Sequence, residues 1–274
     1  MKKIDLDGIA LEYELRGEGE PVVFIHGALI ADSFRPMLED RALADRFRCI
    51  TYYRRGYGES THSSPSVSIA DQAHDCLGLL HHLRLERAHV VGHSLGGVIA
   101  LKLAMDAPQL VRSLAVLEPA LVLGANGPGY RASIARCRDR YRAGDLEGTV
   151  DEFLCARFGP TYREYLERNL PGAFAQAVSN AGSAFEVDMP PVADFAFGEP
   201  DARTITQPVL VVLGADSDAL WPRFGETHRS LLAWLPHSES YVLPHATHAL
   251  QLQNPHDMAV ALAGFLSRNR IQAD

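Results

Sequence analysis

The chain reads Val90-Val91-Gly92-His93-Ser94-Leu95-Gly96-Gly97 where an apolar strand pattern meets a helix-forming stretch, Val98 to Met105. This strand–turn–helix context distinguishes a nucleophile elbow, the sharp turn that exposes a catalytic serine, from a chance Gly-x-Ser-x-Gly match. The reversal is expected to hold Ser94 in a strained backbone conformation with its hydroxyl at the tip. Gly92 and Gly96 flank the serine because a Cβ at either position would collide with the neighbouring strand or helix turn.

A serine that attacks a carbonyl also needs donors for the oxyanion that forms. Leu95 starts the predicted helix, so its backbone N–H points outward at the positive end of the helix dipole. A second donor is expected because loss of a single donor typically costs about 3 kcal/mol of barrier. The sequence His26-Gly27-Ala28 follows an apolar run, and Gly27 allows a turn that presents the amide of Ala28. We expect His26 to brace this loop.

The base that activates Ser94 is predicted in a loop after the last apolar run. His248 ends the segment Leu243-Pro244-His245-Ala246-Thr247-His248, and an amphipathic stretch, Pro255 to Arg268, follows. His245 is the competing candidate. We favour His248 because two small residues directly before it allow a close approach.

A carboxylate that orients this histidine is expected at the end of a strand. The run Val209 to Leu213 is followed by a loop that offers Asp216 and Asp218, while Glu118 directly follows the run 114–117. Each of the three equally suits a solvated loop, so the residues alone leave the choice open. The order serine, acid, histidine is the one typical of this elbow.

Strand and helix patterns alternate along much of the chain. Asp7-Gly8 joins two short strand patterns in a hairpin signal. Short apolar runs follow at 22–25, 49–52, 90–91, 114–117, 209–213 and 241–243. Such runs suit parallel strands covered on both faces, and helix-period segments such as Ile69 to Leu83 lie between them. The alternation predicts an α/β fold with a mostly parallel, doubly wound sheet.

The alternation stops after Leu117 and resumes at Gln207-Pro208-Val209. Between these points the sequence shows helical patterns separated by glycines and prolines. We therefore predict a core made of residues 1–119 and 204–274, with residues 120–203 inserted as a helical cap. The cap is expected over the carboxyl ends of the strands, since ligands bind at that edge of open α/β sheets.

Composition excludes several classes of partner. The net charge is −8, and no basic block resembles a nucleic-acid footprint. No apolar run approaches the roughly 18 residues of a membrane span, and no apolar leader is visible. Four scattered cysteines lack metal or disulfide spacing. We expect a cytoplasmic protein that acts on a small molecule without cofactor or metal, and the oligomeric state stays open.

With these pieces in place, the chain resembles the α/β-hydrolase family over nearly its whole length. The family's His-Gly-x loop matches His26-Gly27-Ala28, and its Arg-Gly-x-Gly-x-Ser segment matches residues 55–60. The elbow matches residues 92–97, and the late histidine loop matches Thr247-His248. Two positions depart from the pattern. Tyr53 replaces an aspartate that usually braces the Arg-Gly loop, and Thr247 replaces a glycine.

The resemblance implies roles for the candidate residues. Ser94 would be the nucleophile and His248 the base, with the amides of Ala28 and Leu95 as the oxyanion hole. Many members carry a Gly-x-x-Ser-Asp-x-Leu segment whose aspartate is the acid, and residues 214–220 fit it. That match favours Asp218, with Glu118 and Asp216 as reserves.

These roles predict a serine hydrolase that cleaves an ester, lactone or thioester of a small to medium, largely apolar substrate through an acyl-enzyme. A serine at the elbow argues against dehalogenases and epoxide hydrolases, which need a carboxylate there. A cofactor-free carbon–carbon bond hydrolase or lyase on the same residues is the first alternative, and a non-catalytic ligand receptor is the second. The cap would decide which substrate reaches Ser94. Its arginines between 131 and 142 are typical of a solvated helix face.

Overall fold

The computed structural model describes residues 1–62, 67–124 and 127–271. In these residues one sheet of eight strands has the order β1-β2-β4-β3-β5-β6-β7-β8. The strands are β1 (Lys2–Leu6), β2 (Ile9–Arg16), β3 (Glu20–Ile25), β4 (Phe47–Tyr53), β5 (Ala88–His93), β6 (Val111–Leu117), β7 (Val209–Gly214) and β8 (Ser238–Leu243). β1 and β2 pair antiparallel and β2 pairs antiparallel with β4, whereas all later neighbours are parallel. The predicted mostly parallel sheet is confirmed.

The register of the central strands brings three loops to one point. β5 lies between β3 and β6, and Gly92 is level with Ile25 in β3 while His93 is level with Leu117 in β6. The chain therefore leaves the sheet at the same edge after all three strands. This edge is the carboxyl edge, where ligands bind in open α/β sheets.

Helices cover both faces of the sheet because strand side chains alternate between two apolar clusters. Val90 belongs to one cluster and Val91 to the other. The first cluster packs against α3 (Ile69–His82), α4 (Leu95–Asp106) and α12 (Arg223–Trp234). The second packs against α1 (Arg35–Leu38), α2 (Arg41–Ala44) and α14 (Pro255–Arg268).

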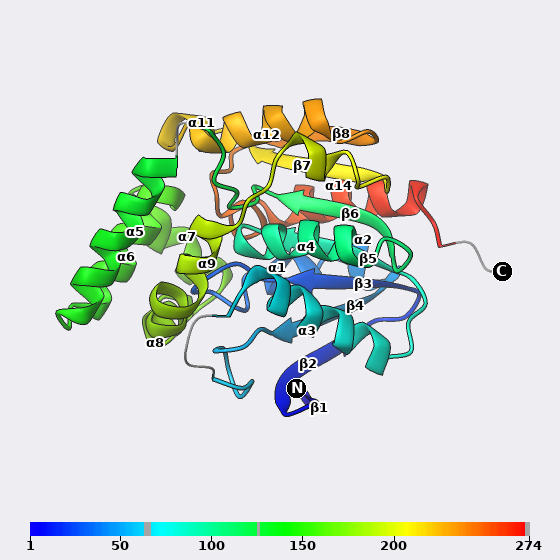
Figure 1. Cartoon of the computed structure of the whole chain (residues 1–274), viewed down its shortest axis with the longest axis horizontal. Coiled ribbons are helices and arrows are strands. Elements are labelled where there is room, and N and C mark those ends of the chain that lie inside the picture. Colours follow the sequence, from blue (N-terminus) through cyan, green and yellow to red (C-terminus); the bar gives the residue numbers. More distant parts are fainter. Residues whose placement is uncertain (63–66, 125–126, 272–274) are drawn as a thin grey trace.

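Among its described residues, the segment between β6 and β7 consists of helices joined by loops and contains no strand. It contains α5 (Gly127–Arg142), α6 (Leu146–Phe158), α7 (Tyr162–Asn169), α8 (Ala173–Ser179), the π-helix η2 (Ser183–Asp188), α9 (Met189–Asp194) and α10 (Glu199–Ala202). We call this segment the insertion. Helices α5 to α9 lie beyond the carboxyl ends of the strands (Figure 1).

Two short helices complete the fold. They are α11 (Ser217–Leu220), which follows β7, and α13 (Leu250–Gln253), which precedes α14. None of the helices within the described ranges combines the length and apolar character that a membrane crossing requires.

Candidate active site

Ser94 occupies the turn between β5 and α4 in the strained conformation that the sequence predicts. Its backbone angles are φ 54° and ψ −118°. A Cβ on Gly92 would lie 2.3 Å from the carbonyl oxygen of Gly96, and one on Gly96 would lie 1.9 Å from that of Ile25. Both distances are far below van der Waals contact, so only glycine fits at these two positions. The elbow is therefore formed by close packing of α4 against β3 and β5.

His248 lies beside Ser94 in the loop between β8 and α13. Its Nε2 is 2.9 Å from Ser94 Oγ, and its Nδ1 is 2.7 Å from Glu118 Oε2. Glu118 is the first residue after β6, and its second oxygen, Oε1, accepts a hydrogen bond from the Gly214 N–H at 2.7 Å. A continuous chain of hydrogen bonds thus joins carboxylate, imidazole and hydroxyl. His245, the competing histidine, is exposed.

The favoured carboxylate, Asp218, is not placed against His248, and this corrects the sequence-based choice. Asp218 lies in α11 with 44% of its side chain exposed, and its partner is Arg229 at 3.6 Å. Asp216 is exposed at the start of the same helix. Asp216 and Asp218 follow β7, which is two strands away from β5. Glu118 follows β6, which lies directly beside β5. The reserve candidate is therefore the one within reach of the histidine.

Burial and neighbouring charges set the protonation of the Glu118–His248 pair. Burial lowers the pKa of His248 well below its ordinary value, and the positive charges of Arg157 and Arg223 lower it further. The imidazole is consequently neutral near pH 7, as a general base must be. Burial also raises the pKa of Glu118 to about 7, while the nearby Ser217 hydroxyl and the hydrogen bond from the Gly214 N–H favour its charged form.

His93, the variable position of the elbow, contacts the backbone and the ring of His248. Its Nε2 donates a hydrogen bond to the backbone carbonyl of His248 at 2.8 Å, and the two ring centroids are 4.9 Å apart. Burial lowers the pKa of His93 to about 3, so the ring is neutral. Sequence reasoning missed this contact because any residue type is compatible with the variable position.

The loop after β3 passes directly against the elbow. A Cβ on Gly27 would lie 3.2 Å from Ser94 Cβ, so the loop approaches closely because residue 27 is glycine. His26 Nδ1 donates to Gly27 O at 2.7 Å, and His26 Nε2 accepts from the Arg54 N–H at 3.1 Å. His26 therefore braces the loop, as the sequence predicts. Ala28 directly follows Gly27 in this loop.

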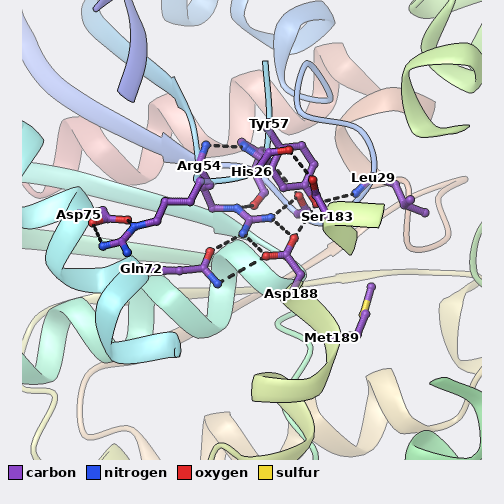
Figure 2. A network of polar contacts seen from close by, with 12 residues as sticks. His26, Leu29, Arg54, Tyr57, Gln72, Asp75, Ser183, Asp188 and Met189 are labelled. Carbon is purple, nitrogen blue, oxygen red and sulfur yellow. Dashed lines mark hydrogen bonds and ion pairs between the residues drawn. The ribbon is translucent and has the colours of Figure 1, made fainter. Parts of the chain in front are cut away.

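A buried polar network ties this loop to the insertion (Figure 2). Arg54 donates to both oxygens of Asp188, at 2.8 and 2.9 Å, and to the Gly27 carbonyl at 3.0 Å. The Tyr57 hydroxyl donates to Asp188 at 2.6 Å, and Gln72 contacts both Arg54 and Asp188. Asp188 ends the π-helix η2, so the network joins the insertion to the core. Where family members have an aspartate, the Tyr53 hydroxyl donates to Asp32 at 2.8 Å.

A small cavity of about 20 Å³ adjoins Ser94 and His248. This volume holds about one water molecule. The core and the segment after β7 supply Ser94, Leu95, Trp221, Arg223, Phe224 and His248, and the insertion supplies Ala120, Tyr130, Phe153, Arg157, Met189 and Val192. The insertion thus forms one wall of the site. Across the described residues, no group of three or more His, Cys, Asp and Glu side chains is placed to hold a metal ion.

Comparison with known proteins relates the chain to hydrolases. A sequence model of the α/β-hydrolase fold matches residues 20–255. The 2-(acetamidomethylene)succinate hydrolase of Mesorhizobium japonicum is 26% identical over 227 residues, which cover 79% of this chain and 78% of that protein. The crystal structure of a hydrolase from Pseudomonas aeruginosa superimposes with a TM-score of 0.79 at 26% identity, covering 96% of this chain and 97% of that one.

Another relative is a longer protein. The dihydrolipoyllysine-residue acetyltransferase component of the acetoin cleaving system of Cupriavidus necator is 34% identical over 164 residues. The match covers 60% of this chain and 42% of that protein, so the chain spans less than half the length of this relative.

Proposed function

Because the chain belongs to the α/β-hydrolase fold family, we propose that it is a serine hydrolase. It cleaves an ester, lactone or thioester of a small to medium, largely apolar substrate through an acyl-enzyme. The hydrogen-bonded chain Glu118–His248–Ser94 carries this proposal, because each member has the partner that its role requires. The relative named as a hydrolase of an acetamido-substituted succinate supports a hydrolytic reaction.

In this mechanism Ser94 Oγ attacks the substrate carbonyl while His248 Nε2 takes the hydroxyl proton. The Glu118 carboxylate holds the Nδ1–H tautomer and stabilises the imidazolium that forms. The backbone N–H groups of Leu95 and Ala28 donate to the oxyanion of the tetrahedral intermediate. Leu95 is the first residue of α4, so its N–H has no acceptor within the helix.

The second half of the reaction releases the acid. His248 donates its proton to the leaving group, which departs and leaves an acyl-enzyme on Ser94. His248 then takes a proton from water as the water attacks the acyl carbonyl, and returns that proton to Ser94 Oγ when the acid leaves. The same three side chains therefore serve both steps.

Residues 120–203 act as the cap of this enzyme, over a core of residues 1–119 and 204–274. The cavity supports this division because insertion side chains such as Phe153 and Met189 face Ser94 across it. The cap determines which acyl group reaches the serine.

Substitution of the nucleophile tests the proposal. Ser94→Ala should lower turnover of a short-chain 4-nitrophenyl ester by roughly 10⁴-fold or more and abolish labelling by a fluorophosphonate probe. Ser179→Ala, at an exposed helix end, is the matched control and should behave as wild type. Full turnover by a folded Ser94→Ala variant would rule the proposal out.

The two candidate histidines provide a second test. His248→Ala should lose activity to a similar extent, whereas the exposed His245→Ala should retain it. Parallel assays with dienone substrates test carbon–carbon cleavage, and turnover confined to those substrates would contradict the acyl-ester assignment.

A further inference from the structure

Two buried arginines line the cavity beside Ser94. Arg157 comes from α6 of the insertion and is 5% exposed, and Arg223 starts α12 and is 4% exposed. The Trp221 ring lies near both, with its centroid 4.3 Å from Arg157 Cζ and 5.9 Å from Arg223 Cζ. Two guanidinium groups from distant parts of the sequence therefore meet at one wall of the site.

Neutral groups accept hydrogen bonds from only some of the N–H donors of these two arginines. Arg157 Nη1 donates to the Phe153 carbonyl at 3.0 Å, while its Nη2 is buried without a hydrogen-bond partner. Arg223 donates twice to the Leu121 carbonyl, at 3.1 and 2.7 Å. The aromatic faces of Phe153 and Tyr130 lie 3.5 and 4.3 Å from the two Cζ atoms. Each guanidinium has five N–H donors, so several remain for another acceptor.

Neither guanidinium forms an ion pair with Asp or Glu in the ranges 1–62, 67–124 and 127–271. A buried charge without a counter-charge is strongly unfavourable. Accordingly, burial lowers the pKa of Arg157 to about 9, and the neighbouring Arg223 contributes to this shift. The third fully buried arginine, Arg54, differs because Asp188 neutralises it (Figure 2).

We propose that Arg157 and Arg223 bind a carboxylate carried by the acyl part of the substrate. The enzyme then hydrolyses monoesters or monothioesters of dicarboxylic acids, or lactones that carry a carboxylate. This inference rests on the proposed function and narrows its largely apolar substrate to one whose acyl part ends in a carboxylate. A guanidinium presents N–H donors in a plane that matches a carboxylate. Hydrolysis creates a second carboxylate at Ser94, so two guanidinium charges face two carboxylates in the product complex.

A bound substrate carboxylate also changes how the two arginines affect His248. Unpaired, their charges lower the pKa of His248 and disfavour the imidazolium that forms during attack. A bound carboxylate offsets these charges and makes proton transfer to His248 easier. A substrate that carries a carboxylate therefore binds more tightly and also makes His248 a stronger base.

Matched ester pairs test the proposal. Monomethyl succinate, glutarate and adipate are compared with methyl butanoate, pentanoate and hexanoate, which have the same acyl chain lengths. At least one acid ester should exceed its neutral partner in kcat/KM by roughly tenfold or more. Arg157→Met and Arg223→Met should collapse this ratio, mainly through KM, and the corresponding Lys variants should restore part of it. Arg136→Met, which removes an exposed charge from the same insertion, should leave the ratio unchanged.

Two outcomes separate this inference from the proposed function. Ser94-dependent hydrolysis of both series with equal kcat/KM overturns the carboxylate site and leaves the serine hydrolase intact. No Ser94-dependent hydrolysis of any acyl compound overturns both.

Binding and stability give a readout that does not depend on turnover. Titration of the Ser94→Ala enzyme should show tighter binding of glutarate or adipate than of the equal-length monoacids or inorganic phosphate, and tighter phosphate binding overturns the assignment.

In the absence of ligand, Arg157→Met should raise the thermal midpoint because it removes an unpaired buried charge. Arg54→Met should lower the thermal midpoint. A similar drop for Arg157→Met would mean that Arg157 stabilises the fold.

Discussion

Glu118 Oε2 lies 2.7 Å from His248 Nδ1, and the two residues are 130 positions apart in the sequence. The contact depends on strand order, because β6 lies directly beside the strand that carries Ser94. The carboxylate that contacts His248 therefore comes from the strand next to the one that carries Ser94 rather than from the strand beyond it.

Glu118→Gln should lower kcat by about 10³- to 10⁴-fold, because an amide no longer secures the Nδ1–H tautomer of His248. Steady-state kinetics on a neutral activated ester measures the effect. Asp218→Asn is the matched control and should leave kcat close to wild type, since Asp218 is half-exposed and contacts Arg229. The reverse result would assign the acid role to Asp218.

The acidic limb of kcat/KM should lie near or below pH 7, because protonation of either member of the Glu118–His248 pair stops the reaction, and burial raises the pKa of Glu118 to about 7 and lowers that of His248. Removing a nearby positive charge raises the pKa of His248, so Arg157→Met should shift the limb to higher pH. The profile is best measured with a neutral ester, whose own charge does not change. Arg136→Met should not move the limb, and a wild-type limb well above pH 7 would contradict the prediction.

Gly96→Ala should destabilise the protein by about 1–3 kcal/mol or prevent folding, because the added Cβ lies 1.9 Å from the Ile25 carbonyl oxygen. Urea unfolding gives the free energy. Gly129→Ala in α5 is the control, since a Cβ there meets nothing within 4 Å. That change should stabilise the helix by about 0.5–1 kcal/mol. Equal effects at the two positions would contradict the packing argument.

The elbow could be predicted because its constraints are local. The apolar run, the glycines around Ser94 and the following helix are adjacent in sequence, and each requires the same turn. The parallel sheet and the position of the helical insertion followed from the same local patterns. The position of His248 beside Ser94 could be predicted because this histidine lies in the loop after the last strand pattern.

The acid and the arginines could not be predicted in the same way. Glu118 and Asp218 both follow apolar strands, and only the order of β6 and β7 in the sheet separates them. Arg157 and Arg223 are typical of solvated helix faces by residue type. Their burial depends on Trp221 and on contacts between α6 and α11, which no local pattern contains.

Asp188→Asn should destabilise the protein by about 3–5 kcal/mol, because it leaves the Arg54 charge buried without its partner. Burial opposes the charge of Arg54 and Asp188 raises the pKa of this guanidinium, so removing the carboxylate takes away the main interaction that offsets the burial of the charge. Urea unfolding with an unchanged m-value measures the loss. Glu199→Gln is the control. It breaks the exposed Arg203–Glu199 pair and should cost about 0.5 kcal/mol or less.

The network predicts a second effect of Asp188→Asn, on catalysis. Arg54 also donates to the Gly27 carbonyl, and Met189, next to Asp188, lines the cavity. Loss of the pair should therefore loosen both the Ala28 loop and the insertion, which lowers kcat and raises KM together. The double variant Arg54→Met with Asp188→Met should be more stable than either single variant, because no unpaired charge remains. Additive losses in the double variant would show that the two residues act independently.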